Sequence, residues 1–566
     1  MVALRKSWML GVGAVLCALL WFALLAERPL FDPDEGRYAE IPREMLSGGD
    51  WVIPHLNGLA YLEKPPLQYW ATALAFRAFG QSEFTARLCT GLAGYLSLAA
   101  VFFLGWRLWG VDAGIRAALF CSASTLFVLL GHQLTLDMLL SFWLTAALGC
   151  FLMAQRREAA GQRREAAGHW RAWMLGCWAS MALALLTKGL IGALIPAAAL
   201  GAYVCWQRDW ALLRRLNFRR GLLLFTAIAS PWLVLAARAD RRFFGFFFIR
   251  EHFQRFLTPI EHRTEPWWFF VPVLVVGIAP WLPQAAQALA SPGAARLPRG
   301  EFDPSRLLWI WCVFILIFFS CSDSKLIPYI LPAVPALALL CAARGAARRD
   351  AGEDGGRGSL LAGSLLTLAS CAGLLGYVSG LWGSTEARAL LPLIRPMLCW
   401  TCVLLALGAM ICATCVWKGR PLAALAGLCG SWFLATGTIL VAASSVQAMY
   451  SAKDVALVLR TQAGMGDSAG LGAEVPMFAV QEYQQSLAFY LRRTMVLVDY
   501  RDEFDLGLTE DPKRGIATLG QFAEVWRPLR AGYAVMRPST QERLSGLGLP
   551  MREVARLQDR VIVSRR

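Results

Sequence analysis

The sequence predicts a polytopic α-helical membrane protein that carries a small α/β domain near its carboxyl end. Hydrophobic residues fill 57% of the 566 positions, and the mean hydropathy is +0.48, which is more apolar surface than a soluble fold of this size buries. The 55 lysines and arginines outnumber the 39 acidic residues, but they gather between apolar runs, as in membrane proteins. The positive charge therefore argues for a membrane and against nucleic acid as the partner.

Thirteen apolar runs have lengths near the ~17–25 residues that cross a bilayer. The first follows Arg5 and Lys6, exceeds a usual signal-peptide core and lacks an AxA cleavage site, so we interpret it as a retained helix. The predicted spans are 9–25, 88–106, 114–131, 138–153, 172–187, 189–206, 221–237, 267–289, 307–320, 326–343, 360–381, 397–417 and 421–443.

Basic residues fall in alternate loops, with clusters such as Arg214 and Arg215 or Arg348 and Arg349. The positive-inside rule places these loops and the amino terminus in the cytoplasm. The other loops, beginning with residues 31–70, then face outward, and an odd number of spans leaves the carboxyl terminus outside as well.

Residues 1–443 form the predicted transmembrane domain, and residues 444–566 form a separate domain without a membrane-length apolar run. Short apolar strands alternate there with helical patterns, which is typical of an α/β fold. The strands are predicted at 475–480, 495–498, 533–536 and 561–563, and the helices at 481–493 and 519–529. No glycine-rich phosphate motif occurs in this domain, so we expect it to act as a lid or support.

The fifteen cysteines resemble neither a disulfide framework nor a metal site. Cys399, Cys402, Cys412 and Cys415 have a CxxC…CxxC spacing that usually signals zinc, but all four lie in one apolar span. Small polarisable residues on a membrane helix explain them better.

The first outward loop concentrates charge directly after a span, in the sequence DPDEGRYAEIPREM. Asp34 and Glu35 could form a solvated acidic cap around a Pro33 turn. The following residues instead predict an amphipathic helix along the membrane surface. Its apolar face holds Tyr38, Ile41, Met45 and Leu46, and its polar face holds Arg37, Glu40, Arg43 and Glu44. A second interfacial helix is predicted to start at Pro65 or Pro66, preceded by Tyr61, Glu63 and Lys64.

Later outward loops add isolated polar groups beside apolar spans. Asp137 stands at the mouth of the fourth span, as a boundary marker or as a functional carboxylate. Lys188 lies in a short link between two spans, where snorkelling explains it as well as function does. Lys325 and Tyr329 begin the tenth span.

The loop DRRFFGFFFIREHFQRFLTPIEHRTEPWW interleaves Arg250, His252 and Arg255 with phenylalanines. Interfacial anchoring explains the aromatic residues. The cations among them are typical of an anion site within an apolar vestibule.

Four motifs in this order, DPDEGRYAEIPREM, YLEKPPLQYW, REHFQRF and SKLIPYILP, closely resemble the bacterial transferases that move 4-amino-4-deoxy-L-arabinose from undecaprenyl phosphate to lipid A. Those enzymes are related to the protein O-mannosyltransferases in the C-type glycosyltransferase superfamily, and the resemblance covers essentially the whole chain. It implies a pentosyltransferase in a bacterial inner membrane whose active site and carboxyl-terminal domain face the periplasm. It also implies lipopolysaccharide modification that gives resistance to polymyxin and other cationic antimicrobial peptides.

The resemblance implies site residues. Asp34 matches the proposed catalytic aspartate, Glu35 lies beside it in the acidic motif, and Asp137 matches the second functional carboxylate. The expected substrate-binding residues are Arg37, Tyr61, Glu63, Lys64, Arg250, Arg255, Lys325 and Tyr329. Relatives often have glycine just before the lysine matched by Lys325, where this chain has Ser324, so the role of Lys325 is less secure than that of Lys64.

The departing phosphate needs nearby cations, and Lys64 and Arg255 are the principal candidates. Asp34 would act as a general base toward a hydroxyl acceptor. A lipid A phosphate, with a second pKa near ~6, is already anionic, so Asp34 would then orient the acceptor or stabilise positive charge on the sugar. Asp137 or Glu63 would pair with the sugar's ammonium group.

This chemistry requires no metal, although Glu63 and His252 could bind an adventitious divalent ion. The expected partners are the undecaprenyl-phosphate sugar, lipid A and membrane lipids, without nucleic acid, and the expected state is a monomer. One alternative is a related transferase that uses another sugar or a protein or glycan acceptor. Another is a lipid transporter or flippase, which would carry charged or broken helices at the membrane midplane and an inverted repeat.

Overall fold

The computed structural model describes residues 2–156, 166–254, 264–291, 302–352, 356–462, 475–557 and 559–565. The chain forms two compact units. The first comprises Met1–Leu25, Glu63–Gln68 and Cys89–Ala442, and the second comprises Ala26–Leu62, Tyr69–Leu88 and Ala443–Arg566. The second unit is thus assembled from three separate stretches of chain. The domain boundary predicted between 443 and 444 stays a prediction.

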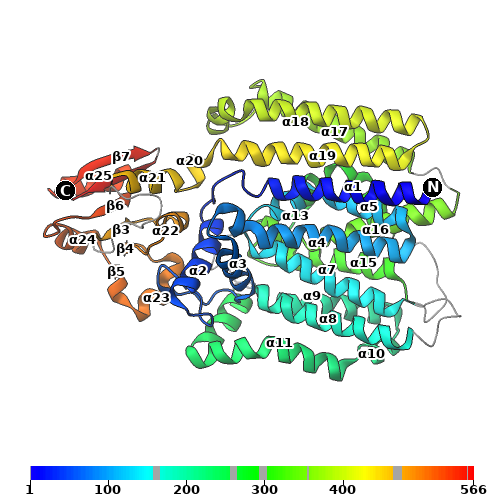
Figure 1. The fold of residues 1–566 in the computed structure, drawn as a ribbon, viewed down its shortest axis with the longest axis horizontal. Coiled ribbons are helices and arrows are strands. Elements are labelled where there is room, and N and C mark those ends of the chain that lie inside the picture. Colours follow the sequence, from blue (N-terminus) through cyan, green and yellow to red (C-terminus); the bar gives the residue numbers. More distant parts are fainter. Residues whose placement is uncertain are drawn as a thin grey trace. The chain divides into compact units, whose positions relative to one another are not determined.

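The first unit is a bundle of long helices (Figure 1). Its longer helices are α1 (Val2–Ala23), α4 (Glu83–Trp109), α5 (Val111–Ser122), α6 (Thr125–Gly131), α7 (Leu136–Gln155), α8 (Ala166–Lys188), α9 (Ile191–Gln207), α11 (Phe218–Ala239), α13 (Phe270–Gly277), α14 (Leu282–Leu289), α15 (Pro304–Ser320), α16 (Ala333–Asp350), α17 (Arg357–Val378), α18 (Thr385–Trp417) and α19 (Pro421–Ser444). Shorter helical segments are α10 (Ala211–Arg214), η1 (Gly245–Gln254), η2 (Ala279–Trp281) and η3 (Ile327–Ile330).

Each predicted span overlaps one of these helices or successive helical segments. Within the described residues, seven helices are long and apolar enough to cross a membrane, or up to nine if each bent pair is one span. The predicted class, a polytopic helical membrane protein, is confirmed. The count of thirteen spans stays a prediction.

The two bent pairs break the helical hydrogen-bond ladder within apolar sequence. α5 and α6 meet at 71°, and α13 and the segment Ala279–Leu289 meet at 84°. Backbone groups released by such a break need other partners, since lipid offers none. At the first break the hydroxyl of Ser122 donates to the carbonyl of Leu119 at 3.1 Å, and that of Ser124 donates to Phe120 at 3.0 Å.

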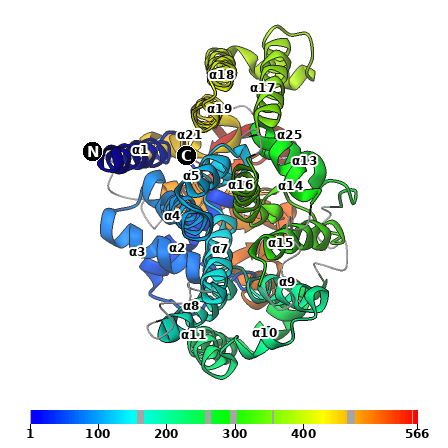
Figure 2. The same cartoon turned by 90° about the vertical axis from the view of Figure 1, so that its right-hand side faces the viewer.

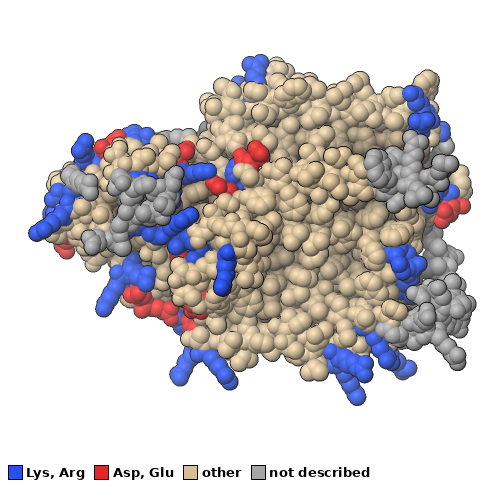
Figure 3. Space-filling model, in the orientation of Figure 1, with Lys and Arg blue, Asp and Glu red and all other residues tan. Residues whose placement is uncertain are grey.

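The surface of the bundle fits a bilayer. Viewed along the helix axes, the long helices lie side by side with α17, α18 and α19 grouped together (Figure 2). In Figure 3 the visible face of the bundle is almost free of charged side chains between its ends. Exposed apolar residues on this unit include Leu223, Leu365 and Trp400. All fifteen cysteines are free thiols, and the four with zinc-like spacing lie on α18.

The second unit contains the predicted α/β fold. Its helices are α2 (Asp34–Gly48), α3 (Leu67–Phe79), α20 (Gln447–Tyr450), α21 (Lys453–Gln462), α22 (Gln485–Leu491), η4 (Asp502–Phe504), α23 (Asp505–Glu510), η5 (Pro512–Arg514), α24 (Leu519–Trp526) and α25 (Pro538–Gly546). Its strands are β1 (His55–Leu56), β2 (Leu59–Ala60), β3 (Met477–Val480), β4 (Val496–Val498), β5 (Gly515–Ile516), β6 (Tyr533–Met536), β7 (Arg552–Leu557) and β8 (Arg560–Ser564).

Six of these strands form one sheet in the order β5-β4-β3-β6-β8-β7. The strands β3 to β6 pair in parallel, and β8 pairs antiparallel with both β6 and β7. β3 and β6 are fully buried, as central parallel strands usually are. The four predicted strands are confirmed, whereas β5 and β7 were not predicted.

The polar face predicted for α2 is covered by protein, whereas a helix lying along the membrane surface would expose it to solvent. Glu40, Arg43 and Glu44 are buried, because α2 packs against α22 of the carboxyl-terminal region. Burial of these charges is tolerated through pairing: the guanidinium of Arg43 donates to both carboxylate oxygens of Glu40 at 2.6 Å. The helix includes the residues of both predicted faces, but its charged side faces protein.

The first loop and the carboxyl-terminal region therefore lie on the same side of the membrane. Asp32 accepts hydrogen bonds from the backbone nitrogen and the hydroxyl of Ser486 at 2.6 and 2.7 Å. The side chain of Asn57 accepts from and donates to the backbone of Met495 at 2.7 and 2.8 Å. An even number of spans must separate these segments, as the predicted topology requires.

Candidate active site

One polar cluster joins two neighbouring helix ends in the first unit. Asp137 lies in the first turn of α7 and Lys188 in the last turn of α8. A carboxylate is favoured at a helix amino end and a cation at a carboxyl end, and because α7 and α8 pack together these ends meet. The two side chains form an ion pair, and the Lys188 ammonium lies 5.0 Å from the ring centre of Tyr329. We call Asp137, Lys188 and Tyr329 the Asp137 cluster.

A second cluster of the same unit surrounds Lys64. Its Nζ atom lies 2.8 Å from Oε2 of Glu251 and 3.9 Å from Oε2 of Glu63. The side chains of Lys64 and Glu251 are 12% and 5% exposed, so the pair is screened little by solvent. We call Glu63, Lys64 and Glu251 the Lys64 cluster.

The local backbone explains how Lys64 and Glu251 are presented. Lys64 precedes Pro65 and Pro66, whose fixed φ angles stiffen the chain. Glu251 lies in η1, a π-helix that spans Gly245–Gln254, and π-helical turns are frequent at functional sites. Both residues thus sit on irregular but constrained backbone.

Two other predicted cations of this unit are placed differently. Lys325 is buried, and its ammonium donates to the carbonyl of Ser322 at 2.5 Å, so it holds its own loop together. Arg250 is exposed, with its guanidinium 5.1 Å from the ring centre of Phe246. Arg255 and the side chain of His252 lie outside the described residues, and so the predicted metal pair cannot be placed. Groups of three or more metal-ligating side chains are absent from the described residues.

The second unit contains the acidic motif. Glu35 is fully buried, and its carboxylate accepts from Nε and Nη2 of Arg87 at 2.8 and 2.9 Å and from Nη2 of Arg28 at 3.0 Å. Burial alone would raise the pKa of Glu35, yet the two guanidinium groups hold it well below its usual value. The ionised carboxylate of Glu35 binds both Arg28 and Arg87 and so fixes the loop around Asp34.

Asp34 differs from its neighbour Glu35. Its side chain is 47% exposed in the first turn of α2, with Nη1 of Arg37 at 3.5 Å, so its carboxylate is available to a substrate. Arg37 also donates to Oε2 of Glu503 at 2.5 Å. Tyr61 is buried just after β2, and its backbone nitrogen donates to Pro54 at 2.8 Å.

Sequence reasoning assigned no substrate role to two residues that the structure places in these clusters. Lys188 carried a weak signal as a lone lysine between two apolar spans, and its pairing with Asp137 adds weight to the functional interpretation. Glu251 carried almost no signal beyond its position between Arg250 and His252. Its contact with Lys64 joins residues 187 positions apart.

Two family models match the chain. Residues 9–241 match the model described as "Dolichyl-phosphate-mannose-protein mannosyltransferase", and residues 468–565 match "Aminoarabinose transferase C-terminal domain". Helices in a membrane with paired carboxylates and cations, together with the first of these matches, define a membrane-embedded glycosyltransferase.

The chain is 31% identical to the crystal structure of ArnT from Cupriavidus metallidurans bound to undecaprenyl phosphate, with a TM-score of 0.88 over 99% of this chain and 98% of that one. The apo structure gives a TM-score of 0.85. The chain belongs to the aminoarabinose transferase family.

Curated relatives agree. The chain is 36% identical over 345 residues to "Undecaprenyl phosphate-alpha-4-amino-4-deoxy-L-arabinose arabinosyl transferase 1" of Sodalis glossinidius, which covers 59% of this chain and 58% of that protein. It is 34% identical over 329 residues to the transferase of Aeromonas hydrophila, covering 57% and 58%. These alignments span slightly less than three fifths of the relatives' length.

Proposed function

We propose that this protein transfers 4-amino-4-deoxy-L-arabinose from undecaprenyl phosphate to a phosphate group of lipid A. The observation that carries the proposal is the Lys64 cluster, in which one ammonium lies beside two carboxylates. An amino sugar linked to a phosphate suits this arrangement, since its phosphate can approach Lys64 while its ammonium pairs with Glu63 or Glu251.

The relatives support the choice of donor. The names of the curated relatives specify this sugar carried on undecaprenyl phosphate, and the ArnT structure holds undecaprenyl phosphate itself. A related transferase with another polyprenyl-linked sugar, or with a protein or glycan acceptor, is the nearest alternative.

In the proposed reaction an oxygen of the lipid A phosphate attacks the anomeric carbon. The bond from that carbon to the donor phosphate oxygen breaks, and undecaprenyl phosphate leaves with the bonding electron pair. Lys64 stabilises the charge that develops on this phosphate. The Asp137 cluster supplies a further cation in Lys188, while Arg250, Arg255 and Lys325 remain proposed contacts to the substrates.

The acceptor determines the role of Asp34. A phosphate monoester with a second pKa near ~6 is ionised at neutral pH, so the attacking oxygen needs no base. We therefore assign Asp34 to orienting the acceptor or stabilising positive charge on the sugar. Glu35 positions the loop through Arg28 and Arg87, and Arg37 and Tyr61 complete the proposed surroundings. A metal ion is not required for any of these steps.

The proposed reaction would change the charge of lipid A at the membrane. We propose that the protein acts as a monomer in a bacterial inner membrane, with the reacting groups facing the periplasm. Attaching an amino sugar to a phosphate removes negative charge from lipid A and adds a positive charge. Polymyxin and other cationic peptides would then bind the modified lipopolysaccharide more weakly.

The decisive experiment is to incubate purified protein with undecaprenyl-phosphate aminoarabinose and lipid A, with and without EDTA, and to analyse lipid A by mass spectrometry. We expect lipid A to gain one aminoarabinose unit in both cases. Undecaprenyl phosphate with a different sugar is the specificity control. Unmodified lipid A from cooperatively folded protein would contradict the proposal, and donor movement across liposomes without transfer would favour a transporter.

A further inference from the structure

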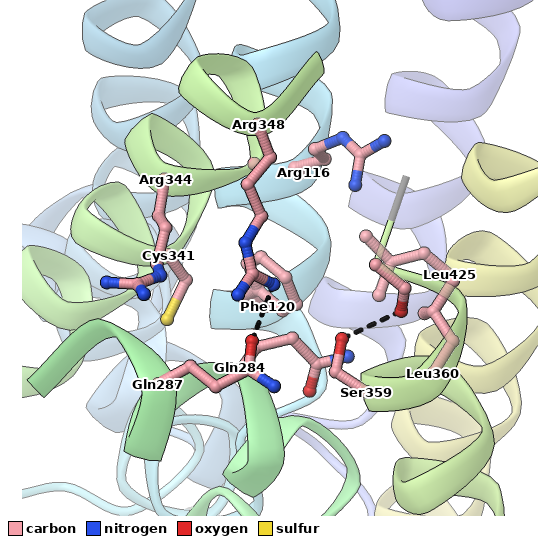
Figure 4. Close-up of a pocket in the computed structure, with 12 residues that line it drawn as sticks. Arg116, Phe120, Gln284, Gln287, Cys341, Arg344, Arg348, Ser359, Leu360 and Leu425 are labelled. Carbon is pink, nitrogen blue, oxygen red and sulfur yellow. Dashed lines mark hydrogen bonds between the residues drawn. The ribbon is translucent and has the colours of Figure 1, made fainter. Parts of the chain in front are cut away.

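A cavity of about 40 Å³ lies among α5, α14, α16, α17 and α19 of the first unit. Figure 4 shows the guanidinium of Arg348 directed toward Gln287, to which it donates at 2.7 Å. The hydroxyl of Ser359 donates to the carbonyl of Gly356 at 2.8 Å. These hydrogen bonds join α14 to α16 and fix the start of α17, so helix packing explains these polar groups and we assign the cavity no ligand.

The sheet of the second unit has the strand order of a dinucleotide-binding fold. Four parallel strands lie side by side in the order β5-β4-β3-β6 (Figure 1). From β3 the chain moves outward through β4 and β5, and it then returns to the other side of β3 at β6. The strand order therefore reverses between β3 and β6. Open α/β sheets bind ligands outside the carboxyl ends of their strands at such a switch point.

The residues that follow β3 and β4 have an unusual backbone conformation. Gln481 and Asp499 come directly after these strands, and their φ angles are 58° and 51°. This left-handed conformation costs free energy at a glutamine and is easier for an aspartate. The backbone nitrogen of Gln481 donates to Val498 and that of Asp499 donates to Ile516, both at 2.8 Å, so the neighbouring strand fixes each turn. Conformations of this kind cluster at binding and active sites.

Side chains connect three strand ends at this edge of the sheet. Nε2 of Gln481 donates to Oδ2 of Asp499 at 2.7 Å, and Oε1 of Gln481 accepts from the hydroxyl of Thr540 at 2.9 Å. Thr540 is buried in α25, the helix that follows β6. The amide of Gln481 thus spans the switch point, and it holds the carboxylate of Asp499, an exposed residue, in one orientation.

Asp499 has the position of a sugar-binding carboxylate. In dinucleotide-binding folds, an Asp or Glu about 20 residues after the first turn hydrogen-bonds a ribose hydroxyl. β3 and β4 correspond to the first two strands of that fold, and Asp499 lies 18 positions after Gln481. A carboxylate makes strong, charge-assisted hydrogen bonds to hydroxyl groups.

The phosphate position of that fold is filled by the protein itself. A dinucleotide places its pyrophosphate against a glycine-rich turn and the start of the helix after the first strand. The corresponding turn here reads QEYQQS and contains no glycine. At the start of α22, the carboxylate of Asp32 accepts from the backbone nitrogen and the hydroxyl of Ser486 at 2.6 and 2.7 Å. A nucleotide would therefore lack its phosphate site, whereas a sugar without a phosphate needs none.

We propose that the second unit binds a sugar residue through two adjacent hydroxyl groups, which donate to the carboxylate of Asp499. Gln481 is the positioning residue for this carboxylate. Arg537, which follows β6 and has a side chain that is 67% exposed, supplies donors for the sugar oxygens at the same edge. The site extends beyond the transfer reaction and uses none of its reacting groups. Its identification with sugars attached to lipid A rests on the proposed function.

The test measures binding to full-length protein in detergent by saturation-transfer NMR. The probes are the core oligosaccharide released from lipopolysaccharide, the same oligosaccharide after periodate oxidation and borohydride reduction, and NAD⁺. Periodate cleaves the bond between two carbons that carry adjacent hydroxyl groups. We expect the intact oligosaccharide to bind and the oxidised one to bind at least about tenfold more weakly. The donor lipid is left out, so the result does not depend on whether transfer occurs.

Two variants locate the site. Asp499→Asn should weaken binding of the intact oligosaccharide by about tenfold, whereas Asp505→Asn, at an exposed carboxylate of the same unit, should bind as the wild type does. Gln481→Gly removes the amide that orients Asp499, but glycine adopts a φ of 58° readily. It should therefore weaken binding while Tm stays near that of the wild type, a combination that a purely structural role would not produce.

Three results would overturn the proposal. The first is an intact oligosaccharide that does not bind or that binds no better than the oxidised one. The second is tighter binding of NAD⁺ than of the oligosaccharide, which would show that Asp32 does not fill the phosphate position. The third is unchanged binding in both Asp499→Asn and Gln481→Gly.

Discussion

The Nζ atom of Lys64 lies 2.8 Å from Oε2 of Glu251, so the principal cation proposed for the donor phosphate is already paired with a carboxylate. A paired lysine is held in place before substrate arrives. Preorganised charge of this kind stabilises a transition state without reorganisation during the reaction.

The substitution Lys64→Met should therefore lower kcat by about 10²-fold, while Lys64→Arg should retain most of the activity because it keeps the charge. Transfer of aminoarabinose to lipid A, quantified by mass spectrometry, measures both. Arg77→Met, on the exposed last turn of α3, is the matched control for loss of a basic residue. Activity of Lys64→Met within twofold of the wild type would remove Lys64 from the mechanism.

Breaking the ion pair between Asp137 and Lys188 should destabilise the protein, whichever of the two residues is replaced. Asp137→Asn or Lys188→Met leaves one poorly hydrated charge without its partner, which typically costs about 3–5 kcal/mol when the pair is fully buried and less here. The double variant should recover part of the lost Tm. The pair Asp112–Arg349 is the control, because its side chains are 40% and 50% exposed and such pairs contribute about 0–1 kcal/mol. Additive losses in the double variant would show that the two residues act independently.

Asp34→Asn tests whether charge matters at the exposed carboxylate of the acidic motif. We expect transfer to fall by about 10²-fold with little change in Tm, because the side chain is half exposed. Near-normal turnover would exclude both roles.

The glycine of the acidic motif should be irreplaceable for packing reasons. A Cβ atom added at Gly36 would lie 2.7 Å from the backbone carbon of Gln485 and closer still to the nitrogen of Ser486. Gly36→Ala should therefore lower stability by about 1–3 kcal/mol. Gly48→Ala, in the same helix, meets no atom within 4 Å and should be neutral or slightly stabilising. Equal Tm values for the two variants would contradict this view of α2.

The carboxylate of Asp32 should make stability depend on pH. Burial raises its pKa to about 6, although the hydrogen bonds from Ser486 oppose the shift. Between about pH 4 and 6 the carboxyl group keeps its proton in the folded state and has released it in the unfolded state. The free energy of unfolding therefore decreases as the pH rises through this interval. Asp32→Asn should remove that loss, so its Tm relative to the wild type should increase over this interval.

Ser486→Ala is the matched test, because it deletes a hydrogen bond that favours the ionised form. The loss of stability should then extend to higher pH, because the pKa of Asp32 rises in the folded state and does not change in the unfolded state. Parallel Tm profiles for the wild type, Asp32→Asn and Ser486→Ala would show that Asp32 does not titrate in this range.

The helices could be predicted because apolar run length is a local property of the sequence. The runs that became α7 or α19 are long and uninterrupted, so each can be recognised without its neighbours. The bends at α5–α6 and α13–α14 could not be predicted, since they depend on which side chains replace the broken backbone hydrogen bonds. β5 was missed because two paired residues carry no periodic signal.

The sequence singled out individual candidate site residues, but it did not show which residues they contact. Asp34, Lys64 and Asp137 stood out as charges beside apolar spans. Their partners lie far along the chain, and pairings such as Asp32 with Ser486, 454 positions apart, depend on the fold. The buried charges of α2 were misjudged for the same reason, because amphipathic periodicity cannot distinguish a solvated face from one covered by another part of the protein.

Because the second unit is discontinuous in sequence, it cannot finish folding until its last segment has been synthesised. The segment 26–62 leaves the ribosome first, but the contacts that Asp32 and Arg37 make with Ser486 and Glu503 require residues synthesised roughly 450 positions later. At about 5–20 residues per second, this delay is on the order of 20–90 s. During that interval the acidic motif lacks its final neighbours. A nascent chain that stalls within the last fifth of the message would thus have a nearly complete helical bundle, while the segment 26–62 would still lack the residues that it contacts in the finished protein.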